Sequence, residues 1–355
     1  VDNVDSGAAN PWGIAWSADS KTVVIAHAGT HEISVINFPA LLAKLAKLPA
    51  KMEEGKTYDY NAASRVQADV PNDLSFLVGV RTRLRLPPGD RGPRAVVLLG
   101  TKAYVANYFS DTLAVVDVAS DYPRWQSIPL GPKPQMTKVR QGEFYFHDAG
   151  ICFQGWQSCA SCHPGDARVD ALNWDLLNDG IGNPKNNKTL LLSHKTPPAM
   201  SMGVRDSAET AVRSGIKHIL FTVQPEEVPA AMDEYLKSLK PVPSPRLVKG
   251  EFSVAANRGR KVFLEAGCAA CHPPPLYTDL KHYDVGTTGR FDRGDKEFDT
   301  PTLIEMWRTA FYLHDGSAAT VHDVLTTHNK NDRHGKTSHL SKDQLHDLAE
   351  FLLSL

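Results

Sequence analysis

Two short segments of the chain share the pattern Cys-x-x-Cys-His, and this repeated pattern limits what the chain can be more than any other feature. The first segment contains Cys159, Cys162 and His163, and the second contains Cys268, Cys271 and His272. In this pattern the two thiols add to the vinyl groups of a haem, and the adjacent histidine binds the iron as its proximal ligand. The sequence therefore predicts two covalently bound haem c groups, with the irons held by His163 and His272.

Two other kinds of site use the Cys-x-x-Cys spacing, namely a four-cysteine zinc site and a thioredoxin-like redox pair. Neither needs a histidine directly after the second cysteine. A long stretch of chain also separates Cys162 from Cys268, which does not suit a compact zinc ribbon. The fifth cysteine, Cys152, has no disulfide partner left within the chain, and we expect a buried small residue or a free thiol there.

The composition is that of a folded protein with several domains. The chain has 355 residues, of which 42% are hydrophobic and 22% charged. The formal net charge of −1 provides no electrostatic basis for binding nucleic acid or an anionic membrane. No apolar run approaches the roughly 18 residues of a membrane span, and the first residues do not form a signal peptide. Because haem c is attached outside the cytoplasm, we expect a mature exported protein, periplasmic or extracellular.

The first third of the chain contains a weak internal repeat of short, strand-like segments. Each copy has three segments separated by polar turns, which is typical of a β-propeller blade. The segments are residues 11–17, 21–27 and 32–37 in the first copy, and 94–97, 102–107 and 111–117 in the second. An insertion between the copies contains a candidate amphipathic helix at 39–51 and a polar stretch at 53–72.

These copies resemble the Tyr-Val-Thr-Asn class of seven-bladed β-propeller repeats, with Tyr104-Val105-Ala106-Asn107 as the nearest match. The resemblance predicts a partial, all-β propeller over residues 1–128. Two blades cannot close a ring, so we expect further blades from a longer precursor or from another chain. The alternative is a small independent β domain.

Helical signals follow a Pro/Gly-rich connector at 129–134, and a second proline-rich linker lies at 241–245. These linkers predict two α-helical, cytochrome c-like domains, the first at 129–245 and the second at 246–355. Helices are expected at 207–221, 225–239 and 255–263, and after Ser341. The apolar face of the last helix, which we expect to pack across the first helix of its domain, consists of Leu345, Leu348, Phe351 and Leu352.

The tandem motifs, together with residues 298–303 and 312–317, resemble the bacterial di-haem cytochrome c peroxidases and their relatives in methylamine dehydrogenase maturation. The resemblance covers about residues 140–355. It implies that the second haem transfers electrons and takes its second axial ligand from the helix after the His-Asp-Gly turn. That position is His328, which predicts bis-histidine ligation by His272 and His328; the alternatives are His314 and His322.

In that family the first haem reacts with peroxide, and a glutamate and a tryptophan assist it. Here Met202 stands at the tryptophan position, and the region 218–221 stands at the glutamate position, so the sequence departs from the family pattern. An acid or a histidine beside an open iron would act as a general acid and base, whereas a histidine bound to the iron would close the site. The candidates for this side of the first haem are His218, His194, Glu209 and Arg213.

We therefore expect an exported di-haem oxidoreductase in which electrons pass from the second haem to the first, to reduce peroxide or oxidise a substrate. Trp174 is a candidate for assisting the transfer, but ordinary core packing is the favoured interpretation of this residue. The alternatives are a cytochrome that only transfers electrons and an interaction protein whose propeller docks a partner. A small cytochrome or a cupredoxin is the expected redox partner, and the resemblance adds calcium between the haem domains as a candidate cofactor.

Overall fold

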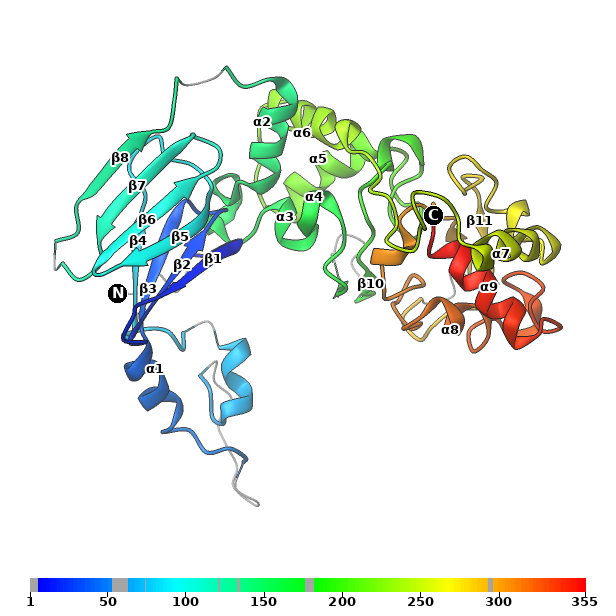
Figure 1. The fold of residues 1–355 in the computed structure, drawn as a ribbon, viewed down its shortest axis with the longest axis horizontal. Coiled ribbons are helices and arrows are strands. Elements are labelled where there is room, and N and C mark those ends of the chain that lie inside the picture. The colour runs from blue at the N-terminus through cyan, green and yellow to red at the C-terminus, as the bar shows by residue number, and fades with distance from the viewer. Residues whose placement is uncertain are drawn as a thin grey trace. The chain divides into compact units, whose positions relative to one another are not determined.

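The computed structural model describes residues 6–52, 63–73, 75–120, 122–132, 135–175, 182–292 and 296–355 (Figure 1). Half of the predicted polar stretch at 53–72 therefore lies outside the described residues. The chain divides into two compact units. The first unit comprises residues 1–137 and 144–161, and the second comprises residues 138–143 and 162–355.

The first unit is built from two four-stranded antiparallel sheets, each with its strands in chain order. The first sheet consists of β1 (Pro11–Trp16), β2 (Thr22–His27), β3 (Glu32–Asn37) and β4 (Arg81–Arg85). The second consists of β5 (Pro93–Leu99), β6 (Lys102–Asn107), β7 (Thr112–Asp117) and β8 (Trp125–Pro129). All six predicted strands are present. The fourth strand of each sheet was not predicted; β4, Arg-Thr-Arg-Leu-Arg, contains one apolar residue among three arginines and gives no apolar strand pattern.

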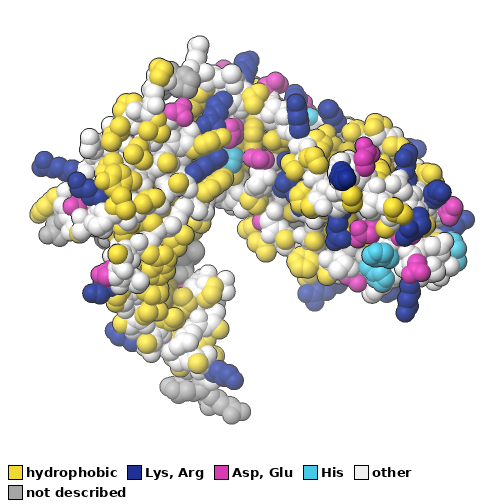
Figure 2. Space-filling view, viewed as in Figure 1, with side chains coloured by type: hydrophobic (Ala, Val, Ile, Leu, Met, Phe, Trp, Pro, Cys, Tyr) yellow, Lys and Arg dark blue, Asp and Glu magenta, His cyan; other side chains and the backbone are white. Residues whose placement is uncertain are grey.

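The two sheets share one apolar core. It is formed by alternate residues of β2, β3, β5, β6 and β7, which is the pattern of strands with one buried face. The core includes Val24, Ala26, Ile33, Val96, Ala103, Val105, Ala114 and Val116. On β1, by contrast, Trp12, Ile14 and Trp16 are exposed, and Figure 2 shows hydrophobic side chains gathered over this unit. The described residues of the first unit form two open sheets and no closed ring.

The insertion between the sheets begins with α1 (Phe38–Leu45), and the 3-10 helix η1 (Gln67–Asn72) follows it. The Asn37 side chain caps α1 by accepting a hydrogen bond from Ala40 N. The helix is shorter than the predicted 39–51: it ends at Leu45, and Pro49 excludes a helix running on through residues 48 and 49.

The second unit is mainly helical. Its longer helices are α5 (Ala208–His218), α6 (Glu227–Ser238), α7 (Val254–Glu265) and α9 (Lys342–Leu352), and it includes the start of α2 (Lys138–His147). The short helical segments of the region after α2 are η2 (Ala149–Ile151), η3 (Phe153–Gly155), α3 (Cys159–Cys162), α4 (Pro164–Ala167), η4 (Ser193–Lys195), η5 (Cys268–Ala270), η6 (Met306–Arg308), α8 (Val321–Leu325) and η7 (Lys330–Asp332). Two small strand pairs complete it: β9 (Asn173–Trp174) with β10 (Lys185–Asn186), and β11 (His282–Tyr283) with β12 (Phe298–Asp299).

Following the predicted linker, we call residues 162–245 the first module and residues 246–355 the second module. In the second module α7 packs against α9, as the sequence predicts, and the Ser341 and Gln344 side chains form the capping box of α9. The helices cross closely at Gly259, where an added Cβ would overlap the carbonyl of Asp347. Gly142 of α2 meets the carbonyl of Ala231 on α6 in the same way. The α7–α9 crossing and the α2–α6 crossing each have a position that only glycine fits. In the described part of the chain, no helix has the length and apolar character needed to cross a membrane.

Candidate haem-binding sites

The first motif occupies α3 and the residue after it. Cys159 and Cys162 are one helical turn apart, which places both thiols on the same side of the segment. Within the first unit, Asn10 holds the beginning of the motif, because its side chain donates to Ser158 Oγ at 2.7 Å and accepts from Ser161 Oγ at 2.7 Å. The motif is therefore tied to the loop that precedes β1.

His163 follows directly, and Nδ1 of its ring lies 3.2 Å from the carbonyl oxygen of Arg168. A carbonyl can only accept, so Nδ1 carries the proton and Nε2 is left with a free lone pair, as an iron ligand requires. Burial lowers the pKa of His163, which favours the neutral imidazole. The position after it, Pro164, is the first residue of α4 and turns the chain away from the motif.

Asn187 and Asp170 support the first motif from within the first module. The Asn187 amide donates to the carbonyl oxygen of Cys162 and to Asp170 Oδ1, the latter at 3.0 Å. Trp174, a candidate for assisting electron transfer, donates from Nε1 to Asp170 Oδ2 at 2.7 Å and is partly exposed on β9. Burial, with the nearby Asp170 carboxylate, raises the pKa of the Cys162 thiol to about 11.

The second motif repeats the geometry of the first. Cys268 begins the 3-10 helix η5, and Nδ1 of the buried His272 donates to the carbonyl oxygen of Tyr277 at 2.9 Å. The acceptor lies five residues after the histidine, as Arg168 does after His163. Burial lowers the pKa of His272 and raises that of Cys268 to about 11.

A second histidine, His334, faces His272. The two ring centroids are 6.4 Å apart and the rings are tilted by 38°. Two imidazoles that bind one metal ion from opposite sides have their ring centroids roughly 6 Å apart. This follows because each metal–nitrogen bond is about 2.0–2.1 Å long and each ring has a radius of about 1 Å. Burial, followed by the effect of His272, lowers the pKa of His334 to about 4, and its Nδ1 is buried without a hydrogen-bond partner among the described residues. The pair fits an iron bound between two neutral imidazoles.

The loop that presents His334 is fixed by Asn329. Its Oδ1 accepts from the His334 amide at 2.7 Å, and its Nδ2 donates to the Gly335 carbonyl at 2.7 Å. Gly335 has a φ of +87°, and a Cβ there would lie 3.6 Å from Cys268 Sγ. The next residue, Lys336, donates from its amide to the carbonyl of Ala266 at 2.9 Å. The loop is therefore held against the second motif.

The structure brings His334, rather than His328, into ring contact with His272. The counting that selected His328 assumed that the helix continues to that residue, but α8 ends at Leu325. Of the alternatives, His314 is buried, donates from Nε2 to Asp292 Oδ2 at 2.9 Å and stacks on Phe298, whereas His322 is exposed. No periodic pattern in the sequence distinguishes His334, because it lies in a polar loop.

Three of the four candidates for the reactive side of the first haem lie together in the first module. His194 Nε2 is 3.0 Å from Asp233 Oδ1, Arg213 donates to Asp233 Oδ2 at 2.8 Å, and Glu209 is 4.0 Å from His194. His218 lies apart, exposed at the end of α5. Sequence analysis missed Asp233, although it is an acid on the buried face of α6. Burial raises its pKa, but hydrogen bonds from His194 and Arg213 outweigh this and lower the pKa below its usual value.

Comparison with known proteins agrees with the motifs. The family model for cytochrome c matches residues 256–355. The chain is 32% identical to hydrazine synthase subunit gamma of Kuenenia stuttgartiensis, over 61% of this chain and 77% of that protein. It is 26% identical to the methylamine utilization protein MauG of Methylorubrum extorquens, over 66% and 81%. A solved structure of Kuenenia stuttgartiensis hydrazine synthase matches with a TM-score of 0.57 at 30% identity, covering 63% of this chain and 89% of that chain.

The motifs, their helical setting and these matches define a c-type cytochrome that binds haem covalently, with a sheet-rich region ahead of the cytochrome c fold. More narrowly, the chain belongs to the superfamily of di-haem cytochrome c peroxidases and MauG proteins, as the resemblance in its sequence indicates. It is therefore a peroxidase-like haem oxidoreductase. When bound, haem supplies an iron that exchanges electrons and can react with peroxide.

Proposed function

We propose that the protein is an exported di-haem enzyme that delivers electrons from the second haem to the first, where peroxide is reduced or a substrate is oxidised. The ring pair of His272 and His334 carries this proposal. Two histidines would saturate the iron of the second haem, which suits that site to electron transfer only. Among the described residues no histidine ring pairs with His163, so the first site is the one left for chemistry. His328 remains the alternative ligand of the second iron.

Proton transfer at the first haem would fall to the cluster around Asp233. His194 is the leading candidate, because Asp233 fixes its ring and the pair is buried. Arg213 would keep Asp233 ionised, and Glu209 is a second acid within reach of His194. A positioned acid–base group of this kind typically contributes about 10²–10⁴-fold to the rate. His218 is the remaining candidate.

Electron paramagnetic resonance of the oxidised protein tests the proposal directly, because it reports the spin state and axial ligands of each iron. One low-spin bis-histidine signal and one distinct signal that responds to peroxide or cyanide are expected. Peroxide turnover with a reduced cytochrome or cupredoxin as electron donor is the matching activity measurement. Two low-spin signals that ignore both ligands, with no turnover, would instead identify a cytochrome that only transfers electrons.

The likeness to hydrazine synthase subunit gamma favours a second candidate, in which the chain is a subunit of a hydrazine-forming enzyme. Purification of the native assembly, followed by measurement of its subunit composition and of hydrazine formation, tests this. A chain that acts alone on peroxide and forms no larger assembly would contradict it.

The first unit suits a partial β-propeller that docks further blades or a partner, because Trp12, Ile14 and Trp16 leave an apolar sheet face exposed. We retain the boundaries 1–128, 129–245 and 246–355 for the propeller and the two haem domains. Calcium also stays a proposal. No group of three or more His, Cys, Asp and Glu side chains in the described residues could hold one ion, so calcium would depend on backbone and amide oxygens.

A further inference from the structure

A buried ion pair joins the two modules. Arg168 of the first module donates from Nε to Glu305 Oε2 at 2.8 Å and from Nη2 to Glu305 Oε1 at 3.0 Å. The two side chains are 5% and 1% exposed. This bidentate arrangement is the most directional form of a salt bridge, because both planar groups must be aligned.

Glu305 is held rigidly by contacts from both modules, so it can act as an anchor. Its carboxylate also accepts from Arg308 Nε at 2.6 Å and from the Val242 amide at 2.5 Å. Its backbone amide donates to the carbonyl of Leu355 at 3.0 Å, and its φ of +64° lies in the left-handed region. Such a conformation persists in a non-glycine residue only where the surroundings enforce it.

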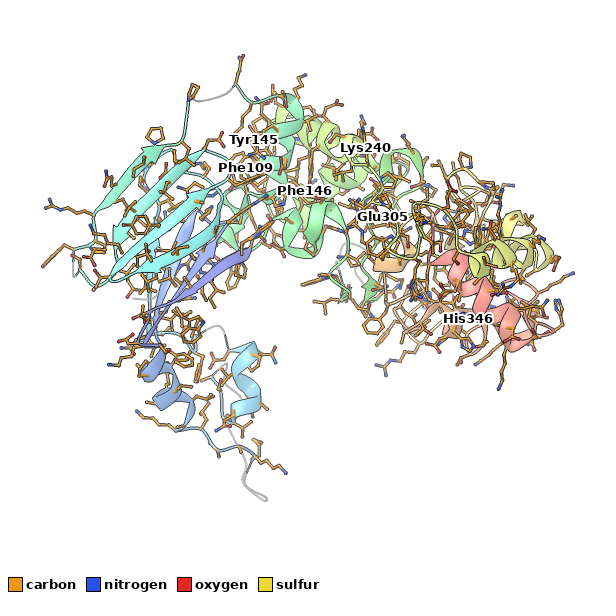
Figure 3. The ribbon with its side chains drawn as sticks, in the orientation of Figure 1. Phe109, Tyr145, Phe146, Lys240, Glu305 and His346 are labelled. Carbon is orange, nitrogen blue, oxygen red and sulfur yellow. The ribbon has the colours of Figure 1, made fainter. Side chains whose placement is uncertain are left out.

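The Arg168 side chain has two further acceptors, both in the first module. It donates to the carbonyl oxygens of Asp166 and Lys240, the latter at 3.1 Å. Figure 3 labels Lys240 and Glu305, which both accept a hydrogen bond from Arg168 Nη2. With four acceptors, the guanidinium and the backbone that carries it have little freedom to move.

The carbonyl of this same residue accepts the hydrogen bond of His163 Nδ1. In the second motif the matching acceptor is the carbonyl of Tyr277, whose side chain packs against Phe263 and Phe351. The two motifs thus share the histidine–carbonyl bond but differ in how the acceptor is held. An apolar cluster holds it in the second motif, whereas an ion pair from the other module holds it in the first.

We propose that Glu305, acting through Arg168, is a positioning residue for His163, so that the first haem has its working potential only when the second module is in place. This rests on the proposed function, in which His163 is the proximal ligand. A hydrogen bond from Nδ1 increases the basicity of the imidazole and favours ferric iron. Loosening the carbonyl of Arg168 weakens that bond and shifts the reduction potential of the first haem upward.

The test is Glu305→Gln in the full-length haem-loaded protein, because glutamine keeps the size of the side chain but removes its charge. Spectroelectrochemical titration should show an upward shift in the potential of the first haem and none in the second. The iron–histidine stretching frequency of the reduced first haem should fall. Arg168→Lys keeps the charge but loses the bidentate geometry, and it should also raise the potential of the first haem. This second variant tests the inference if Glu305→Gln does not fold.

The matched control is Asp347→Asn, which breaks another bidentate pair, between Arg258 and Asp347, with both distances at 2.6 Å. This pair joins α7 to α9 and touches neither motif, so the first haem should keep its potential. Unchanged potentials in both Glu305→Gln and Arg168→Lys, or an equal shift in Asp347→Asn, would overturn the inference. His163→Ala distinguishes a failure of this inference from a failure of the proposed function. If that variant leaves the spectrum of the first haem unchanged, His163 is not the proximal ligand and the proposed function fails instead.

Discussion

The imidazole rings of His272 and His334 face each other with their centroids 6.4 Å apart, although one belongs to a Cys-x-x-Cys-His motif and the other to a polar loop. The His272 ring donates to the Tyr277 carbonyl, and the backbone that carries His334 is held by the Asn329 side chain. The pair is therefore preorganised to bind one metal ion from both sides.

His334→Ala should open the second haem to carbon monoxide and cyanide and remove its low-spin bis-histidine signal. His334→Met should keep the iron six-coordinate and raise its potential, because a thioether favours ferrous iron. Carbon monoxide difference spectra of the reduced protein measure the first effect and potentiometry the second. His328→Ala is the paired variant: ligand binding in it, and not in His334→Ala, would support the prediction of His328 made from the sequence.

His194→Gln should lower peroxide turnover by about 10²–10⁴-fold with little change in the haem spectra, because it removes an acid–base group and not an iron ligand. Asp233→Asn should have a smaller effect on turnover, since it loosens the His194 ring without removing it. Steady-state kinetics of both variants, compared with His218→Gln, decide between the two candidate histidines. A loss confined to His218→Gln would transfer the role to that residue.

The stability of the first unit should fall as the pH falls from about 6.5 to about 4. Burial lowers the pKa of His27 to about 4 from the usual 6.5, so the unfolded chain binds a proton in this range that the folded chain does not. A shift of this size corresponds to about 3 kcal/mol once the pH is below both values. Hydrogen exchange of β2 and β3 against pH measures it, and His27→Gln should flatten the profile.

His346→Gln is the control for this titration, because His346 is an exposed residue of α9 (Figure 3). Its removal should leave the exchange of β2 and β3 unchanged at every pH. A His27→Gln protein whose exchange still depends on pH as in the unmodified protein would assign the effect to another group.

Gly259→Ala should destabilise the second module by about 1–3 kcal/mol, because the new methyl group would overlap the carbonyl of Asp347 and force α7 from α9. Gly215→Ala is the matched change on α5, where a Cβ meets open space. It should stabilise the protein by about 0.4–1 kcal/mol, since alanine is the better helix former. Denaturant unfolding of both variants measures the change in the free energy of unfolding, which should be negative for Gly259→Ala and positive for Gly215→Ala. Equal changes in the two variants would contradict the helix crossing at Gly259.

The sequence alone was enough wherever the chemistry is local. The haem motifs place all their reactive groups within a few residues, and the Ser341 cap and the apolar face of α9 follow from the helical period. The six strands that alternate between apolar and polar residues were also predicted. In each case the residues that act together are neighbours along the chain or are spaced by a known period.

Only the tertiary structure decided which distant groups meet. His334 lies in a loop without a period, and its place opposite His272 depends on where α8 ends and on the hydrogen bonds of Asn329. Arg168 and Glu305 are far apart in the sequence, as are His194 and Asp233, and nothing near either member marks its partner. The sequence shows that a residue is charged. The burial of that charge and its counterion are set by the packing of the chain, and they determine whether the charge stabilises the structure.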